Sequence, residues 1–119
     1  MKIISRKVHA VLDYLSAIIL IAAPWLFHFD SSPAGRNVAI AAGAVIFLMS
    51  LLTAYEGGLF RSIPMSMHLN ADLLLGILLA ASPWIFGFSD EVYLPHLILG
   101  LFAIVASVIT ERSSFSKSI

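Results

Sequence analysis

The 119-residue sequence contains no cysteine and very little charge. Without cysteine there are no disulfides, no thiolate metal ligands and no cysteine nucleophiles. Seven basic and seven acidic residues give a formal net charge of zero, so the charge balance does not indicate a nucleic-acid partner. Charged residues make up 12% of the chain, whereas a soluble domain usually contains about 25%. This scarcity of charge is the first indication of a membrane protein.

Motifs for catalysis and nucleotide binding are also missing. The chain contains no phosphate-binding loop, no Gly-x-Ser-x-Gly, no His-Glu-x-x-His and no dinucleotide fingerprint. We therefore expect no enzymatic activity and no cofactor, with a divalent metal or haem as the alternatives.

Hydrophobic residues, by contrast, make up 60% of the chain, and they are gathered into four blocks at residues 8–27, 38–55, 69–88 and 92–110. A helix needs about 20 apolar residues to cross a hydrocarbon core of about 30 Å. Barrel strands alternate in polarity and are only about 10 residues long. The blocks therefore predict an all-α membrane protein with four transmembrane helices in one membrane domain, residues 1–119.

The basic N-terminus before the first block also fits a cleaved signal peptide. Asp13 inside the block and Pro24-Trp25 at its end do not fit, because cleavage sites require small residues. We therefore expect the first block to be retained as a membrane helix.

Lysine and arginine lie mainly on one side of the predicted membrane. If the helices alternate in direction, six of the seven basic residues share that side: Lys2, Arg6, Lys7, Arg61, Arg112 and Lys117. Arg36 lies alone on the other side. Because basic loops stay inside, we expect a multi-pass protein of the cell (inner) membrane with both termini in the cytoplasm.

The two halves of the sequence repeat each other. A shift of 59 positions superimposes the first helix of each half: His9 on His68, Asp13 on Asp72, and Pro24-Trp25 on Pro83-Trp84. A shift of 57 superimposes the second helix: Gly43 on Gly100, Ser50 on Ser107, and Thr53 on Thr110. Repeat one covers about residues 8–55 and repeat two about residues 68–111. Because each repeat has two helices, we expect same-topology (parallel) helical hairpins that form a four-helix bundle.

Ser82-Pro83-Trp84, together with its partial copy Ala23-Pro24-Trp25, resembles the motif of the SPW repeat family of small prokaryotic membrane proteins. The resemblance extends over both hairpins. It implies a membrane location and a two-helix repeat, and it implies no established activity.

Proline inside a helix removes a backbone hydrogen bond. Pro83 frees the carbonyl of Leu79, and we expect the Ser82 hydroxyl to donate to it. Ala23 has no hydroxyl for the equivalent task. Trp25 and Trp84 are expected at the outer interface, where indole rings prefer to lie. We interpret the motif as a kink with an anchor, and a ligand-binding aromatic box is the alternative.

Each repeat begins with His-x-x-x-Asp, which places both side chains on one helix face. Because ionised groups are costly in lipid, His9, Asp13, His68 and Asp72 should turn inward and meet on the cytoplasmic half of the bundle. The main interpretation is a polar clamp in a structural or accessory protein. One alternative is a proton or divalent-metal site for transport or sensing, suited to zinc, iron or manganese. The second alternative is a haem or quinone protein with His9 and His68 as axial ligands.

Polar residues of the outer loops show no repeated ligand spacing, and we interpret them as a solvated face: His28, Asp30, Asp90, Glu91 and His96. The expected partner is the lipid bilayer, with a homo-oligomer or another membrane protein as further alternatives.

Overall fold

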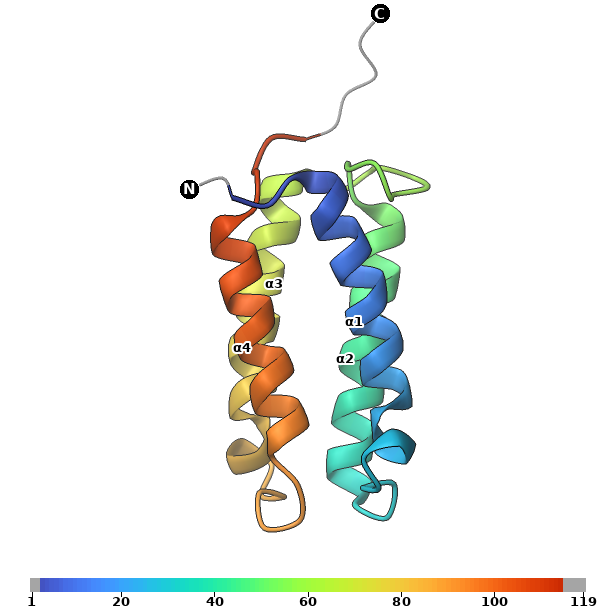
Figure 1. Ribbon diagram of the computed structural model, residues 1–119, viewed down its shortest axis with the longest axis vertical. Coiled ribbons are helices and arrows are strands. Elements are labelled where there is room, and N and C mark those ends of the chain that lie inside the picture. Colours follow the sequence, from blue (N-terminus) through green and yellow to red (C-terminus); the bar gives the residue numbers. More distant parts are fainter. Residues whose placement is uncertain (1–2, 115–119) are drawn as a thin grey trace, which may run out of the picture.

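The computed structural model describes residues 3–114. It contains four helices in chain order, α1 (Arg6–Leu26), α2 (Pro33–Leu52), α3 (Met65–Ile85) and α4 (Leu94–Ile109). The helices form two antiparallel hairpins that stand side by side (Figure 1). The start of α1, the α2–α3 connector and the end of α4 share one end of the molecule (Figure 1). The predicted all-α fold of four helices is confirmed.

Three helices, α1, α2 and α3, are long and apolar enough to cross a membrane. The fourth helix is shorter than predicted: α4 has 16 residues, which at a rise of 1.5 Å per residue is about 24 Å. It begins after Tyr93 with a proline in its first turn. It ends at Ile109 because the backbone of Thr110 is extended and pairs with Ile4.

Helix α2 differs from its predicted range at both ends, and the same kind of pairing explains its C-terminal end. It begins at Pro33, where proline suits the first turn of a helix, rather than at residue 38. It ends at Leu52 rather than at residue 55, because Thr53 is extended and forms a bridge with Ile63.

The two backbone bridges occupy equivalent places in the repeats. Ile4 pairs with Thr110, and Ile63 pairs with Thr53. The shifts of 59 and 57 that align the sequence also superimpose these two pairs. In each pair, the start of one hairpin is joined to the end of the other.

Most contacts between helices lie inside the hairpins, α1 with α2 and α3 with α4. Glycine allows this close packing. A Cβ atom added at Gly100 in α4 would lie 2.5 Å from the backbone nitrogen of Ala80 in α3, and one added at Gly43 would lie 2.8 Å from the carbonyl oxygen of Ala17. Contacts between the hairpins are sparser. The polar groups that join the hairpins therefore contribute a larger share of the interaction between them.

The Ser-Pro-Trp motif lies at the loop end of α3, and its predicted hydrogen bond is present. The Ser82 hydroxyl donates to the Leu79 carbonyl oxygen at 2.6 Å. Pro24 and Pro83 both lie inside their helices. Trp25 and Trp84 are 55% and 54% exposed, as expected of side chains that face lipid and headgroups.

Candidate functional site

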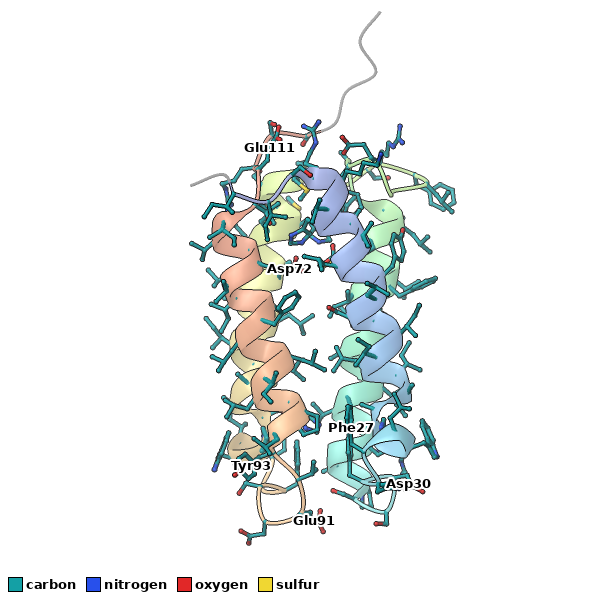
Figure 2. The ribbon with its side chains drawn as sticks, viewed as in Figure 1. Phe27, Asp30, Asp72, Glu91, Tyr93 and Glu111 are labelled. Atoms are coloured by element: carbon teal, nitrogen blue, oxygen red, sulfur yellow. The ribbon has the colours of Figure 1, made fainter. Side chains whose placement is uncertain are left out.

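The four residues of the repeated His-x-x-x-Asp motif meet between the hairpins. His9 and Asp13 are one turn apart on α1, and His68 and Asp72 are one turn apart on α3. The exposed fraction of these residues ranges from 0 to 7%. Figure 2 shows Asp72 inside the bundle, in the half nearer Glu111 and away from Asp30 and Glu91. The cluster predicted from the sequence is present, and we call these four residues the His/Asp centre.

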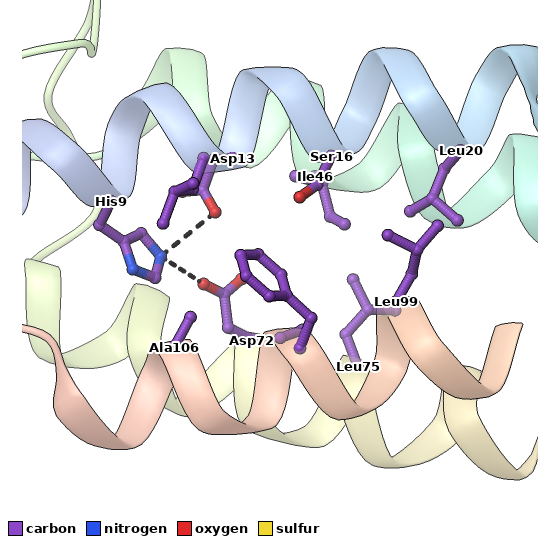
Figure 3. Close-up of a pocket in the computed structure, with 12 residues that line it drawn as sticks. His9, Asp13, Ser16, Leu20, Ile46, Asp72, Leu75, Leu99 and Ala106 are labelled. Carbon is purple, nitrogen blue, oxygen red and sulfur yellow. Dashed lines mark hydrogen bonds and ion pairs between the residues drawn. The ribbon is translucent and has the colours of Figure 1, made fainter. Parts of the chain in front are cut away.

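Imidazoles and carboxylates alternate around the His/Asp centre. The His9 Nε2 atom lies 2.9 Å from Asp72 Oδ2 and 3.2 Å from Asp13 Oδ1. The His68 Nε2 atom lies 2.9 Å from Asp13 Oδ2 and 3.1 Å from Asp72 Oδ2. Figure 3 shows His9 reaching both carboxylates. Each imidazole therefore contacts one carboxylate of its own hairpin and one of the other.

Two threonine hydroxyls orient the histidine rings by hydrogen bonds to the Nδ1 atoms. The His9 Nδ1 atom lies 2.8 Å from Thr110 Oγ1, and the His68 Nδ1 atom lies 2.6 Å from Thr53 Oγ1. Each threonine hydroxyl donates its single hydrogen to a backbone carbonyl four residues earlier. The hydroxyl oxygen must therefore accept from the imidazole. Both histidines carry a proton on Nδ1, and both turn Nε2 toward the carboxylates.

Tyr55 supports only one of the two carboxylates. Its hydroxyl donates to Asp13 Oδ2 at 3.0 Å, and its side chain is fully buried just after the end of α2. Burial, together with the charge of Asp13, raises the pKa of the Tyr55 phenol. The phenol therefore keeps its proton and acts as a donor. The equivalent position in repeat two is Arg112, which donates to Asn70 at the surface.

Sequence reasoning missed these three supporting residues as part of the site. Thr53 and Thr110 carry a usable signal, because the shift of 57 superimposes them just as the shift of 59 superimposes the two histidines. Tyr55 carries no such signal, since its position does not repeat.

A small cavity of about 20 Å³ adjoins the His/Asp centre (Figure 3). Its polar lining residues are His9, Asp13, Ser16 and Asp72, and the other lining residues are apolar. A space of this size holds about one water molecule.

Arg6 forms ion pairs at the end of the molecule that holds the α2–α3 connector. Its guanidinium lies 3.3 Å from a carboxylate oxygen of Glu56 and 3.3 Å from one of Glu111. The two glutamates follow α2 and α4, so Arg6 links the ends of both hairpins. These side chains are partly exposed, with 18 to 34% of their surface accessible.

One prediction for the outer loops is wrong. His96 is fully buried, because it belongs to the first turns of α4 and not to a loop. Its Nε2 atom lies 2.9 Å from the carbonyl oxygen of Gly35, and its ring packs against Phe29 and Phe88. The other residues assigned to the solvated face are exposed: His28, Asp30, Asp90 and Glu91.

The geometry does not fit a haem held by two histidines. Axial ligands must approach the iron from opposite faces of a flat macrocycle. Here the two Nε2 atoms reach the same two carboxylates, and the rings lie only 5.6 Å apart at an interplanar angle of 82°. The adjoining cavity admits about one water, which is also too little for a quinone ring.

The fold and the His/Asp centre define a small multi-helix membrane protein in which a buried polar cluster lies between two helical hairpins. A family model of the SPW repeat domain matches residues 7–110. The chain therefore belongs to the SPW repeat family, as the Ser82-Pro83-Trp84 motif predicted. No curated protein and no solved structure matches the chain.

Proposed function

We propose that this protein is a structural or accessory component of the cell (inner) membrane, and that the His/Asp centre is the clamp that holds its two hairpins together. The observation that carries the proposal is the alternating ring, in which each imidazole contacts a carboxylate of the opposite hairpin at 2.9 Å.

The membrane environment explains the need for a polar clamp. Lipid tails are as apolar as leucine, so burial of apolar surface does not drive helices together there. Contacts between the hairpins are sparse. The bonds of His9 to Thr110 and of His68 to Thr53 also cross between the hairpins. The His/Asp centre and its threonines thus supply four directional contacts where packing supplies few.

The clamp is electrically balanced when both imidazoles are protonated. Each ring then donates from Nδ1 to a threonine and turns the positively charged side that carries Nε2 toward the carboxylates. Two imidazolium ions and two carboxylates have no net charge, which suits a buried position. We infer that the hairpins are parallel repeats about a pseudo-two-fold axis through this centre, because the bridges and the His–Thr contacts map onto one another under the sequence shifts.

A double-mutant cycle across the hairpins tests the clamp. We expect His68→Gln and Asp13→Asn to be non-additive, with a coupling energy of about 0.5–3 kcal/mol, because each removes the partner of the other. The free energy of unfolding is measured in mixed detergent and dodecyl sulfate micelles. His68→Gln combined with Asp30→Asn is the control, since Asp30 is exposed in the outer loop. Additive effects of His68 and Asp13 would contradict the clamp.

The proposed orientation, with both termini in the cytoplasm, is testable by cysteine labelling, because the chain has no cysteine of its own. Ser31 is exposed in the outer loop, whereas neighbouring Ser32 is buried and bonded to Glu91. We expect Ser31→Cys to react with an impermeant thiol reagent in intact cells. Leu59→Cys, at a position of the connector that is 72% exposed, should react only after lysis. The reverse pattern would invert the topology.

A further inference from the structure

We propose that the His/Asp centre is a binding site for one divalent transition-metal ion of the zinc, iron or manganese class. This inference goes beyond the proposed function, because a clamp requires only that the four side chains meet.

The first argument is an unpartnered nitrogen. The His68 Nε2 atom is fully buried and lies near both carboxylates, yet it has no hydrogen-bond partner of acceptable geometry. Because Nδ1 already carries the proton that Thr53 accepts, a neutral ring turns the lone pair of Nε2 toward the carboxylate oxygens. In a neutral ring this lone pair repels the negatively charged carboxylate oxygens. A metal cation bound between them removes the repulsion.

The second argument is size. One ligand atom from each of the four residues can be chosen so that all lie within 4.8 Å of one another. The neighbouring N–O separations are 2.9 to 3.2 Å. A tetrahedral zinc ion with bonds of 2.0–2.1 Å separates neighbouring ligand atoms by about 3.3 Å. These N–O separations need only a slight expansion to surround such an ion, and Asp13, whose two oxygens face different imidazoles, must bind through one of them.

The third argument is charge and ligand chemistry. Two aspartates balance the charge of one divalent ion, so the loaded site has no net charge when both imidazoles are neutral, with a proton on Nδ1 only. Two nitrogens and two carboxylate oxygens suit zinc, iron or manganese better than magnesium or calcium, which prefer oxygen ligands alone.

The supporting residues also match a metal site. Histidines that bind metals almost always donate their other N–H to a neighbouring acceptor, which orients the ring. Thr110 and Thr53 are such acceptors for His9 and His68. Tyr55 orients Asp13 through its hydroxyl. The adjoining cavity provides room for about one water as a further ligand.

The test uses the full-length protein, purified in detergent without a polyhistidine tag, stripped of metal and titrated with Co²⁺. We expect one Co²⁺ per chain, visible absorption bands of a four- or five-coordinate ion, and displacement by Zn²⁺. His68→Gln should abolish the bands. The chain has four histidines, and the other two serve as controls, so His28→Gln and His96→Gln should leave the bands unchanged.

Variants that retain all four ligands distinguish a specific loss of metal binding from a loss caused by misfolding. Thr53→Val and Thr110→Val keep the shape of the side chain and remove the acceptor, and each should lower the affinity for Co²⁺ by about 10–100-fold. Absence of Co²⁺ binding to the wild type overturns the proposal, and so does an affinity that neither threonine variant changes. Either result leaves the coupling between His68 and Asp13 intact, so failure of the metal site is distinguishable from failure of the clamp.

Discussion

Replacing Asp13 and Asp72 together by asparagine is expected to lower the free energy of unfolding by about 3–5 kcal/mol, the cost of breaking a buried ion pair. The two carboxylates are buried and lie within 3.2 Å of both imidazoles. Asparagine keeps the shape of the side chain and removes the negative charge. Unfolding by dodecyl sulfate in mixed micelles, with metal ions removed by chelation, measures the loss.

The control is the double replacement of Glu56 and Glu111 by glutamine. These carboxylates also join the hairpins, through Arg6, but they are partly exposed. Exposed ion pairs contribute about 0–1 kcal/mol, because solvent screens them. We therefore expect the control to cost less than the aspartate pair, although the two variants remove the same number of charges. Equal losses would show that burial of the His/Asp centre has no energetic consequence.

The sequence was sufficient to predict this centre because two physical rules acted together. A spacing of four placed His9 and Asp13 on one helix face, and the cost of ionised groups in lipid required that face to turn inward. The repeat then added His68 and Asp72 at the same depth. Neither rule depends on the packing of individual side chains, which is why the prediction survived errors in the ends of the helices.

The errors at the C-terminal ends of the second and fourth helices share one cause. Hydropathy extended the second and fourth helices through Tyr55 and Thr110, because these residues continue an apolar run. The structure ends both helices at the residue before a threonine, since each threonine pairs its backbone with a segment distant in sequence. Long-range pairing of this kind leaves no local pattern.

Tyr55 and His96 show a different limit. Each is a single polar residue without a repeated counterpart, and each is buried by elements from both hairpins. His96 lies between Phe29 and Phe88, which the Pro-Trp motif places after α1 and α3. Residues so far apart in sequence cannot be recognised as neighbours from the sequence alone. The solvated interpretation of His96 could therefore not be corrected before the fold was known.

Close packing inside the hairpins leads to the second large expected effect. Replacing Gly100 by valine should cost about 3 kcal/mol, at the upper part of the usual range for overpacking. The added Cβ would lie 2.5 Å from the Ala80 nitrogen and 2.7 Å from the Gly76 carbonyl oxygen. Both are backbone atoms, so no side chain can rotate away, and α4 must move off α3.

The equivalent glycine of repeat one provides a second variant, and an exposed residue of α4 provides the matched control. Gly43→Val should cost less than Gly100→Val, because one of its closest contacts, at 2.8 Å, is the flexible side chain of Ile21. Val105→Ile also enlarges an α4 side chain, but Val105 is 56% exposed and should tolerate the addition. Unfolding in mixed micelles ranks the three variants. If Gly100→Val unfolds no more easily than Val105→Ile, the close contact of α3 with α4 is not a source of stability.

Gly100→Val is also expected to change the structure of the His/Asp centre. Thr110 follows directly after α4 and holds the His9 ring by its Nδ1 atom. If Gly100→Val moves α4 away from α3, Thr110 should move away from His9, whereas Thr53 and His68 keep their contact because neither residue lies on α4. The measurable consequence is unequal protection of the two rings, with the Nδ1 proton of His9 exchanging faster in nitrogen-detected NMR. Equal exchange at both histidines would show that helix packing and the polar centre are independent.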